Sequence, residues 1–498
     1  MTPKQKSLVL ITVDSLRADH CGFHGYPRPT TPFLDALTAE SFVVPSAVAA
    51  GAPTYYSLPA IFASRMPLAL GRDVIGLAPG ESTLATALRD AGYATAAFSA
   101  ANPYISSRFG YEQGFEVFED FLDFDQTSSA ETGASAPADL RASSTRNKLN
   151  QSLKRAAQAI GFGPAYDELY FQYCLRVASS RVTSMSALRR FPTAEAMVDR
   201  AISWLRSCER RPFFLWLHLM DPHSPYYPSE EAYRALTRRE VSASQARYVN
   251  EFWKRSDLPP ARLQRKKGSI IELYDAGIRA VDTQVARLVS HLQQLDVWGE
   301  CAFALTADHG EEFLDHGRRY HAPVNLREEI TRVPLMIRDP DSAKRDVTTV
   351  PFSHLHLAPT LLDMLDVRAP EDFRGISLGR NLQQGTSWAD FAISECVYGC
   401  NNPFRGRDRL AARLLSVRSA RHKLVMRIEA GSVEEIYDLE ADPKEERPLL
   451  SGAQKEVRAQ LLQAARNHIR KTSHARPATM RLRSRLRDLG MNLQSNAR

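Results

Sequence analysis

The sequence lacks any long hydrophobic run. No segment reaches the roughly 18 consecutive apolar residues that a membrane-spanning helix needs, and the longest early run, residues 8–13, is too short for the core of a signal peptide. No cleavage site made of small residues follows that run. We therefore expect a protein without a transmembrane segment that resides in the cytoplasm.

Cysteine is also scarce. The chain has 498 residues and 6 cysteines, of which only Cys396 and Cys400 lie close together, and their spacing fits no common zinc motif. This pattern excludes a disulfide scaffold. We expect most of the cysteines to be small buried apolar side chains in a reducing compartment.

The sequence also lacks a large excess of charge of one sign, and it lacks a glycine-rich loop that would bind phosphate. Lys+Arg 64 against Asp+Glu 57 gives a net charge of only +7. Basic residues are concentrated only in the last stretch, so nucleic acid is not expected as a partner. No GxGxxG or Walker sequence is present, which argues against a nucleotide-binding loop.

What the sequence does contain is an alternation of short apolar runs and amphipathic helical segments. This alternation predicts an α/β fold with a doubly wound, mostly parallel sheet flanked by helices. Strands are predicted at residues 8–13, 93–100, 213–220, 301–307 and 333–337. Helices are predicted at residues 81–91, around residues 198–205, and at residues 274–295.

The length allows one large domain or two to three smaller ones. We predict a large domain over residues 1–385, with a mobile insertion at about residues 126–146, where Ser, Thr, Ala and Gly dominate. Residues 386–452 are predicted to form a small subdomain with an antiparallel sheet. A basic helical tail is expected at residues 453–498, packed on the body, with peripheral contact to a membrane surface as the alternative.

Acidic and histidine residues follow three of the predicted strands. They are Asp14 after residues 8–13, Asp308 and His309 after residues 301–307, and Asp221 and His223 after residues 213–220. Because the C-terminal ends of parallel strands share one edge of a sheet, we expect these side chains to gather there. Oxygen and nitrogen ligands of this kind suit a divalent cation. One such aspartate alone is as often a helix cap, but three coincident strand ends favour a metal site.

Motifs spread over roughly residues 7–450 resemble the sulfatase family within the alkaline phosphatase superfamily. They follow the order of that family: ITVDSLRADH at 11–20, HLMDPHSPY at 218–226, ADHGEE at 307–312, HLHLAPTLLD at 354–363 and IYDLEADP at 436–443. The resemblance implies a metal-dependent enzyme that cleaves an ester of sulfate or phosphate.

Two departures from the sulfatase pattern resemble the phosphate-ester members of the superfamily. Sulfatases oxidise a Cys or Ser in a C-x-P-x-R setting to formylglycine, but that position falls on Thr54, which cannot be oxidised in this way. Ser15 stands where sulfatases carry a second aspartate. A threonine nucleophile resembles phosphoethanolamine and phosphoglycerol transferases and nucleotide phosphodiesterases. The run TYYSLP at residues 54–59 is similar to one in the transferases. Ser57 is the alternative nucleophile, although Ile61 stands where its motif needs arginine.

The resemblance implies roles for particular residues. Thr54 is the expected nucleophile, and a base or a metal ion must activate its hydroxyl. The expected metal ligands are Asp14, Thr54, Asp308 and His309. His223 and His321 match positions that bind the substrate or a second metal ion, and we expect both to be catalytic.

Three further residues are weaker candidates. His316 is an alternative to His321, but a structural role is the main expectation for it. Arg17 and Arg65 are candidates for neutralising the charge of the substrate, and the ordinary alternative for each is a place on the surface.

The expected function is hydrolysis of a phosphate ester or diester through a covalent Thr54 intermediate, with a sulfate ester as the other option. The expected cofactor is a divalent ion (zinc, manganese, magnesium or calcium), and the substrate is a small anionic ester, such as one on a glycan or a lipid head group. One alternative is a soluble phosphoethanolamine- or phosphoglycerol-type transferase to a sugar or lipid. Another alternative is a non-catalytic binding module. The complete set of expected site residues argues against it.

Overall fold

A computed structural model of the chain describes residues 5–72, 74–122, 184–208, 212–341, 350–379, 391–428, 434–450 and 454–473. The predicted insertion at residues 126–146 and the last part of the predicted basic tail lie outside these described residues. Among the helices that are described, none is both long enough and apolar enough to cross a membrane.

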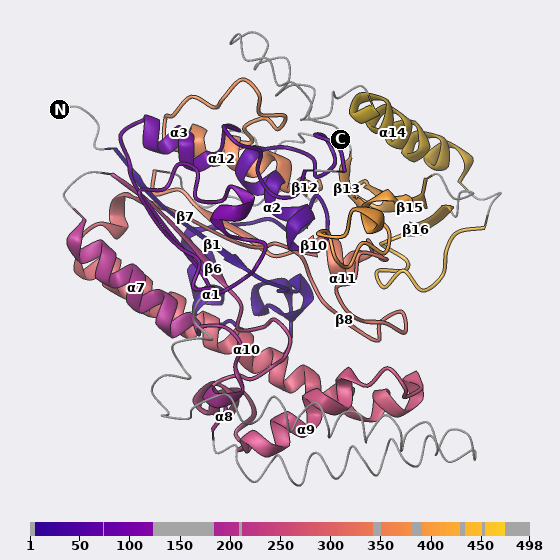
Figure 1. Ribbon diagram of the computed structural model, residues 1–498, viewed down its shortest axis with the longest axis horizontal. Helices are drawn as coiled ribbons and strands as arrows, with labels where there is room; N and C mark the ends of the chain where they lie inside the picture. The colour runs from indigo at the N-terminus through magenta and orange to yellow at the C-terminus, as the bar shows by residue number, and fades with distance from the viewer. Residues whose placement is uncertain are drawn as a thin grey trace, which may run out of the picture.

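A 7-stranded sheet runs through the centre of the molecule in the order β2-β11-β7-β1-β6-β4-β5 (Figure 1). Its strands are β1 (Ser7–Val13), β2 (Phe42–Val43), β4 (Ala94–Ser99), β5 (Val117–Glu119), β6 (Phe213–Leu219), β7 (Cys301–Ala307) and β11 (Leu335–Arg338). The strands from β7 to β5 are parallel to one another, and β11 is antiparallel to both β7 and β2. The predicted mostly parallel α/β sheet is therefore confirmed.

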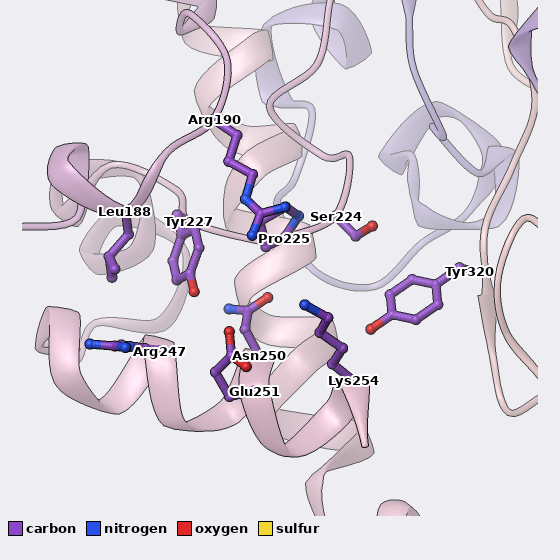
Figure 2. Close-up of a pocket in the computed structure, with 10 residues that line it drawn as sticks. All are labelled: Leu188, Arg190, Ser224, Pro225, Tyr227, Arg247, Asn250, Glu251, Lys254 and Tyr320. Atoms are coloured by element: carbon purple, nitrogen blue, oxygen red, sulfur yellow. The ribbon is translucent and has the colours of Figure 1, made fainter. Parts of the chain in front are cut away.

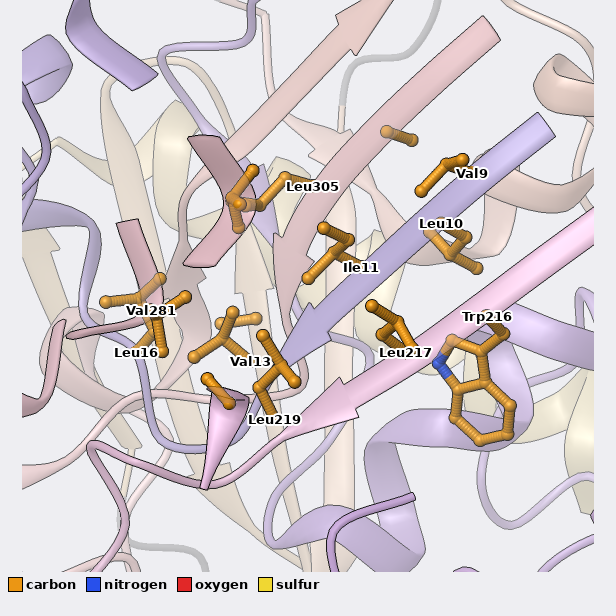
Figure 3. Packing of buried hydrophobic residues seen from close by; sticks show 14 of the residues in the cluster. Val9, Leu10, Ile11, Val13, Leu16, Trp216, Leu217, Leu219, Val281 and Leu305 are labelled. Atoms are coloured by element: carbon orange, nitrogen blue, oxygen red, sulfur yellow. The ribbon is translucent and has the colours of Figure 1, made fainter. Parts of the chain in front are cut away.

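The central strands are apolar on both faces because helices cover both faces of the sheet. Every residue of β1, β6 and β7 is buried. Figure 3 shows Ile11 and Val13 of β1 beside Leu217 and Leu219 of β6 and close to Leu305 of β7. This packing makes the three strands a rigid base for the side chains at their C-terminal ends.

Helices lie on both sides of the sheet (Figure 1). On one side are α2 (Thr54–Ala63), α3 (Leu84–Asp90) and α12 (Leu357–Met364); on the other are α7 (Ala194–Ser207) and α10 (Pro260–Gln294). Three further helices pack against α10: α1 (Pro32–Leu37), α8 (Glu230–Thr237) and α9 (Ala243–Lys254). The predicted helices at residues 81–91, 198–205 and 274–295 correspond to α3, α7 and α10.

Local sequence explains where several of these helices begin. The side chain of Thr193 accepts a hydrogen bond from the backbone N–H of Ala196 and so caps α7. Ser242 and Gln245 form a capping box at the start of α9. Pro260 opens α10, where its missing N–H costs no hydrogen bond.

The predicted strand at residues 333–337 is wrong as a single strand. Pro334 divides it, because proline has no N–H for a sheet ladder. The first part, β10 (Arg332–Val333), joins a 3-stranded sheet with β3 (Ala47–Val48) and β12 (Phe352–Ser353), while β11 joins the central sheet. Just before this division lie the short hairpin of β8 (Glu312–Phe313) and β9 (Arg319–Tyr320) and the helix α11 (Glu328–Thr331).

A 4-stranded antiparallel sheet follows in the C-terminal part of the chain, as predicted. It consists of β13 (Ala392–Val397), β14 (Arg413–Arg418), β15 (His422–Arg427) and β16 (Glu434–Asp438), and α14 (Lys455–Ser473) packs against β14 and β15. The domain boundaries at residues 385 and 452 stay predictions.

Glu395 of β13 connects this C-terminal part to the segment around α2. Its backbone N–H donates to the carbonyl oxygen of Ala50 at 2.8 Å, and its Oε1 accepts from the N–H of Leu68 at 3.0 Å. Its Oε2 lies 2.9 Å from Nε2 of His468 in α14. Burial alone would raise the pKa of the fully buried Glu395, but His468 and Arg413 bring that pKa below its usual value.

Candidate active site

Three neighbouring strands of the central sheet deliver the core of the candidate site. Asp14 follows β1 directly, and its backbone N–H donates to the carbonyl oxygen of Leu219 at the end of β6. Asp308 follows β7, and His218 is the last residue but one of β6, in register with Thr12 of β1. The expected gathering of carboxylates and imidazoles at one sheet edge is therefore present.

Asp14, His218 and Asp308 form a group that fits a divalent cation. Each offers one ligand atom, these atoms all lie within 4.8 Å of one another, and all three residues are buried. Among the residues that the structure describes, Nε2 of His218 and Oδ2 of Asp308 are buried and have no hydrogen-bond partner. Buried polar atoms without partners are costly, and a carboxylate–imidazole set with such free atoms is the donor chemistry that zinc and related ions prefer.

The sequence analysis missed His218. This histidine lies in the apolar strand FFLWLHL, where a lone histidine is easily taken for a core residue. Its Nδ1 lies 2.9 Å from Oγ1 of Thr12, which also accepts from Nε1 of Trp216. These contacts fix the ring so that Nε2 lies 3.4 Å from Oδ2 of Asp14. Two signals in the sequence pointed to it: His218 opens the motif HLMDPHSPY, and it stands two residues before the end of the strand predicted at residues 213–220.

Thr54 lies at the first position of α2, with its hydroxyl between two of the predicted metal ligands. Its Oγ1 is 3.4 Å from Oδ2 of Asp14 and 3.3 Å from Nε2 of His309. Nδ1 of His309 lies 2.9 Å from the carbonyl oxygen of Gly310, which can only accept a hydrogen bond. That contact places a proton on Nδ1 and leaves Nε2 of the neutral ring as an acceptor facing the Thr54 hydroxyl.

Ser57, the alternative nucleophile, has a different position. It is completely buried in α2, and its Oγ donates to the carbonyl oxygen of Thr54 at 3.2 Å. The hydroxyl is thus occupied by a bond within the helix. Pro53, the N-cap residue of α2, makes no side-chain capping bond, so the N-terminal end of the helix is open at Thr54.

The charge of Asp14 is stabilised by its surroundings. Burial alone would raise the pKa of this carboxyl, but the imidazoles of His223, His218 and His309 outweigh burial and hold the pKa well below its usual value. Nδ2 of Asn102 also donates to Oδ2 of Asp14 at 2.9 Å. Asn102 is a second residue that the sequence analysis missed, because it lies in a loop after β4 and in none of the recognised motifs.

His223 and His321 lie together beside this group. Their ring centroids are 5.1 Å apart, and the ring of His321 is 4.5 Å from that of His309. Burial lowers the pKa of His321, but the Glu311 carboxylate, whose Oε1 is 3.1 Å from Nδ1, outweighs burial and raises that pKa to about 9. Burial lowers the pKa of His223. The site thus holds a cationic imidazole next to a neutral one at neutral pH.

A hydrogen-bonded chain holds His321 in place. Oε2 of the fully buried Glu311 accepts from the hydroxyl of Tyr226 at 3.0 Å, while its Oε1 contacts His321. Asn250 of α9 accepts from the backbone N–H of Tyr226 at 2.8 Å and donates to its carbonyl oxygen at 2.9 Å. α9 is therefore coupled through Tyr226 and Glu311 to an imidazole of the site.

Asp221 was expected at the same edge, and the structure places its carboxylate elsewhere. Its Oδ2 accepts from the backbone N–H of Ala194 at 2.8 Å, at the N-terminus of α7. Burial raises its pKa to about 6. Asp221 therefore stabilises the start of a helix, which is the alternative role of an aspartate that follows a strand.

The expectation that Arg17 and Arg65 lie on the surface is wrong. Arg17 is 6% exposed and its guanidinium contacts Asp19 and Asp315, while Arg65 is 5% exposed and pairs with Glu81. Both cations are thus already neutralised by carboxylates.

His316 has structural contacts, in keeping with the main expectation for it. Its Nδ1 lies 2.6 Å from Nη1 of Arg327, and its Nε2 is 3.5 Å from Oε1 of Glu329.

The sequence matches the family model described as Sulfatase over residues 6–367, and the model described as N-sulphoglucosamine sulphohydrolase, C-terminal, over residues 318–472. The chain belongs to the sulfatase family. It is 23% identical to an arylsulfatase of Clostridium perfringens over 469 residues, which cover 88% of this chain and 89% of that protein. As a member of this family it is an ester hydrolase.

Solved structures share its fold. A protein in complex with its substrate D-glucosamine-2-N,6-O-disulfate has a TM-score of 0.67 and 16% sequence identity, covering 94% of this chain and 98% of that one. A phosphonate monoester hydrolase of Agrobacterium radiobacter has a TM-score of 0.64 and 19% identity, covering 95% and 96%. Sulfatases and phosphonate monoester hydrolases both belong to the alkaline phosphatase superfamily, so the resemblance found in the sequence is confirmed.

Proposed function

We propose that this sulfatase-family hydrolase cleaves a phosphate ester or diester with the Thr54 hydroxyl as its nucleophile. The observation that carries the proposal is the position of Thr54 at the open N-terminus of α2, with Oγ1 at 3.4 Å from Asp14 and 3.3 Å from His309. Ser57, the other hydroxyl of the same motif, points into its own helix.

In this proposal the chain's own groups handle the proton and the developing charge. Nε2 of His309 accepts the proton of Thr54 as Oγ1 attacks phosphorus, and the bond to the leaving alcohol breaks to give a phosphothreonine. The N-terminal end of α2 favours the anionic ester oxygens. Water then hydrolyses the phosphothreonine and restores the threonine.

His321 and His223 act on the other side of the ester. The imidazolium of His321, held by Glu311 at 3.1 Å, offers positive charge to the phosphoryl oxygens or a proton to the leaving alcohol. His223 lies beside it, and its buried Nδ1 has no hydrogen-bond partner in the described part of the chain. A buried donor or acceptor of this kind is suited to a substrate contact.

A divalent ion fits this site. Asp14, Asp308 and His218 would hold it, with His309 and the Thr54 oxygen at its border. When bound, such an ion lowers the pKa of a hydroxyl and polarises the ester. Zinc, manganese, magnesium and calcium are all candidates, and the ligand set of two carboxylates and one imidazole favours zinc or manganese.

Sulfate esters are the second candidate substrate class. Relatives such as the Clostridium perfringens enzyme are named arylsulfatases, and sulfate and phosphate esters have the same tetrahedral shape. The argument for phosphate is that Thr54 cannot become the formylglycine on which sulfatases depend.

A substrate panel tests the proposal on the metal-loaded enzyme. We expect faster turnover of 4-nitrophenyl phenylphosphonate, bis(4-nitrophenyl) phosphate or 4-nitrophenyl phosphate than of 4-nitrophenyl sulfate. Efficient cleavage of the sulfate with no cleavage of any phosphorus ester would refute it. Addition of ethanolamine or glycerol to the assay identifies a transferase, since the alcohol would then carry the phosphoryl group in place of water.

A further inference from the structure

A cavity of about 500 Å³ has chain neighbours of the two candidate-site histidines in its wall (Figure 2). Ser224 and Tyr320, which line it, are the chain neighbours of His223 and His321. The opposite wall is α9, which contributes Asn250 and Lys254 among other residues. A volume of this size suits a substrate of a few rings or sugar units.

The cavity is lined by three cations and a single carboxylate. The cations are Arg190, Arg247 and Lys254, and the carboxylate belongs to Glu251. Within the described part of the chain, none of the three cations forms a hydrogen bond or salt bridge with a carboxylate. Arg17 and Arg65 behave differently, because each is paired. Unpaired positive charge around a cavity favours an anionic occupant.

The wall that carries these cations is held firmly against the site. Asn250 joins α9 to Tyr226 by two hydrogen bonds, at 2.8 Å and 2.9 Å. Nε of Arg189 donates to the carbonyl oxygen of Tyr227 at 2.8 Å, which fixes the segment that ends in Arg190. Figure 2 shows the ammonium of Lys254 and the hydroxyl of Tyr320 pointing toward the same space. Such a preformed wall reduces the entropy that is lost on binding.

We infer that the substrate carries a second anionic group, separate from the ester that is cleaved, and that Arg190 and Lys254 bind this group in the cavity. Arg247 adds long-range attraction from the same wall. The group is a carboxylate, a sulfate or a phosphate, since each pairs well with guanidinium and ammonium. The inference rests on the proposed function, because it takes His223 and His321 as the place where the ester is held.

A binding comparison tests the inference without depending on turnover. Calorimetric titrations use the metal-loaded Thr54→Ala protein and two matched ligand pairs: phenyl phosphate against 4-carboxyphenyl phosphate, and D-glucosamine-6-O-sulfate against D-glucosamine-2-N,6-O-disulfate. We expect the second anionic group to tighten binding about tenfold in at least one pair, as charge-assisted hydrogen bonds do. The first pair tests a carboxylate and the second a sulfate.

Charge variants show whether the cavity is responsible. The double variant Arg190→Gln/Lys254→Gln should bind both ligands of a pair equally well, and Glu251→Gln should increase the preference for the ligand with the second anionic group. Lys455→Gln, on the exposed face of α14, is the control and should leave this preference unchanged. Equal binding within both pairs, or an advantage that survives the double variant, would overturn the inference. Hydrolysis of phenyl phosphate by the wild-type enzyme is measured separately, so failure of the proposed function is distinguished from failure of this inference.

Discussion

The backbone N–H of Ser15 donates to Oδ1 of Asp308 at 3.1 Å, which joins the ends of β1 and β7. Ser15 has a φ of 60°, in the left-handed region that non-glycine residues seldom adopt. Its hydroxyl donates to Oδ1 of Asp14 at 2.8 Å. One residue therefore orients both carboxylates of the candidate metal site, from a backbone conformation that is costly for serine.

Replacing Ser15 should lower the affinity of the site for its metal ion. Ser15→Ala removes the hydroxyl that orients Asp14 but keeps the backbone bond to Asp308, so metal affinity should fall about tenfold. Competition with a chelator on the purified protein measures this. Ser207→Ala removes an exposed hydroxyl at the end of α7 and is the control, with affinity close to wild type. Unchanged affinity in Ser15→Ala would contradict the orienting role.

Removing the Thr54 hydroxyl should abolish most of the turnover. Thr54→Ala is expected to lower kcat by about 10³-fold or more, because among the described residues it is the Thr54 hydroxyl that contacts both Asp14 and His309. Ser57→Ala should lower kcat far less, since that hydroxyl bonds to its own helix. Peptide mass spectrometry of the trapped intermediate provides a second measurement. A phosphoryl group found on Ser57, or full activity in Thr54→Ala, would contradict the assignment.

The metal ligands can be ranked by metal content after dialysis. Asp14→Asn and Asp308→Asn should each lower bound metal well below one ion per chain, because an amide is a much weaker ligand than a carboxylate. His218→Gln should do the same if the group Asp14–His218–Asp308 holds the ion. Plasma emission spectrometry measures the content. Full occupancy in His218→Gln together with loss in His309→Gln would restore the ligand set predicted from the sequence.

Glu312 should make the protein less stable as the pH rises. It is completely buried, and neither of its carboxylate oxygens has a hydrogen-bond partner among the described residues. Burial together with the neighbouring Glu329 raises its pKa to about 8. The unfolded chain has a pKa near the ordinary glutamate value. The native state therefore binds this proton more tightly than the unfolded chain does. The stability that Glu312 contributes is fully present below about pH 4.5 and is lost as the pH rises to about 8.

Glu312→Gln keeps the shape of the neutral form and removes this dependence. The variant should equal wild type near pH 4.5 and exceed it by up to roughly 4 kcal/mol above pH 8, as read from urea unfolding at several pH values. Glu371→Gln, on an exposed residue, is the control and should show no such trend. A stability difference that does not grow with pH would contradict the raised pKa.

The strands and most of the site could be predicted because their signals are local. The apolar runs ending at Asp14 and Asp308 are visible without any knowledge of the fold, and parallel strands bring their C-terminal ends together. His218 could not be assigned in this way. Its role depends on its register with Thr12 and on the direction of its ring, which only the assembled sheet determines.

The sequence interpretation failed where a long-range partner decides the role. Asp221 follows a strand just as Asp14 does, but Ala194 of α7 provides the N–H that takes its carboxylate. Arg17 and Arg65 were expected on the surface because arginine is usually exposed. Their carboxylate partners include Asp315 and Glu81, at sequence distances over which composition and spacing give no information.

The position of Glu395 makes the C-terminal part of the chain a poor candidate for exchange between relatives. A chimera that replaced residues 391–473 would have to bring its own carboxylate at position 395 together with an imidazole at position 468. Otherwise the N–H of Leu68, just after the Thr54 helix, would lose its carboxylate acceptor in β13, while the backbone bond from residue 395 to Ala50 would remain. The family models overlap over residues 318–367, so a crossover would have to be chosen with this carboxylate in mind.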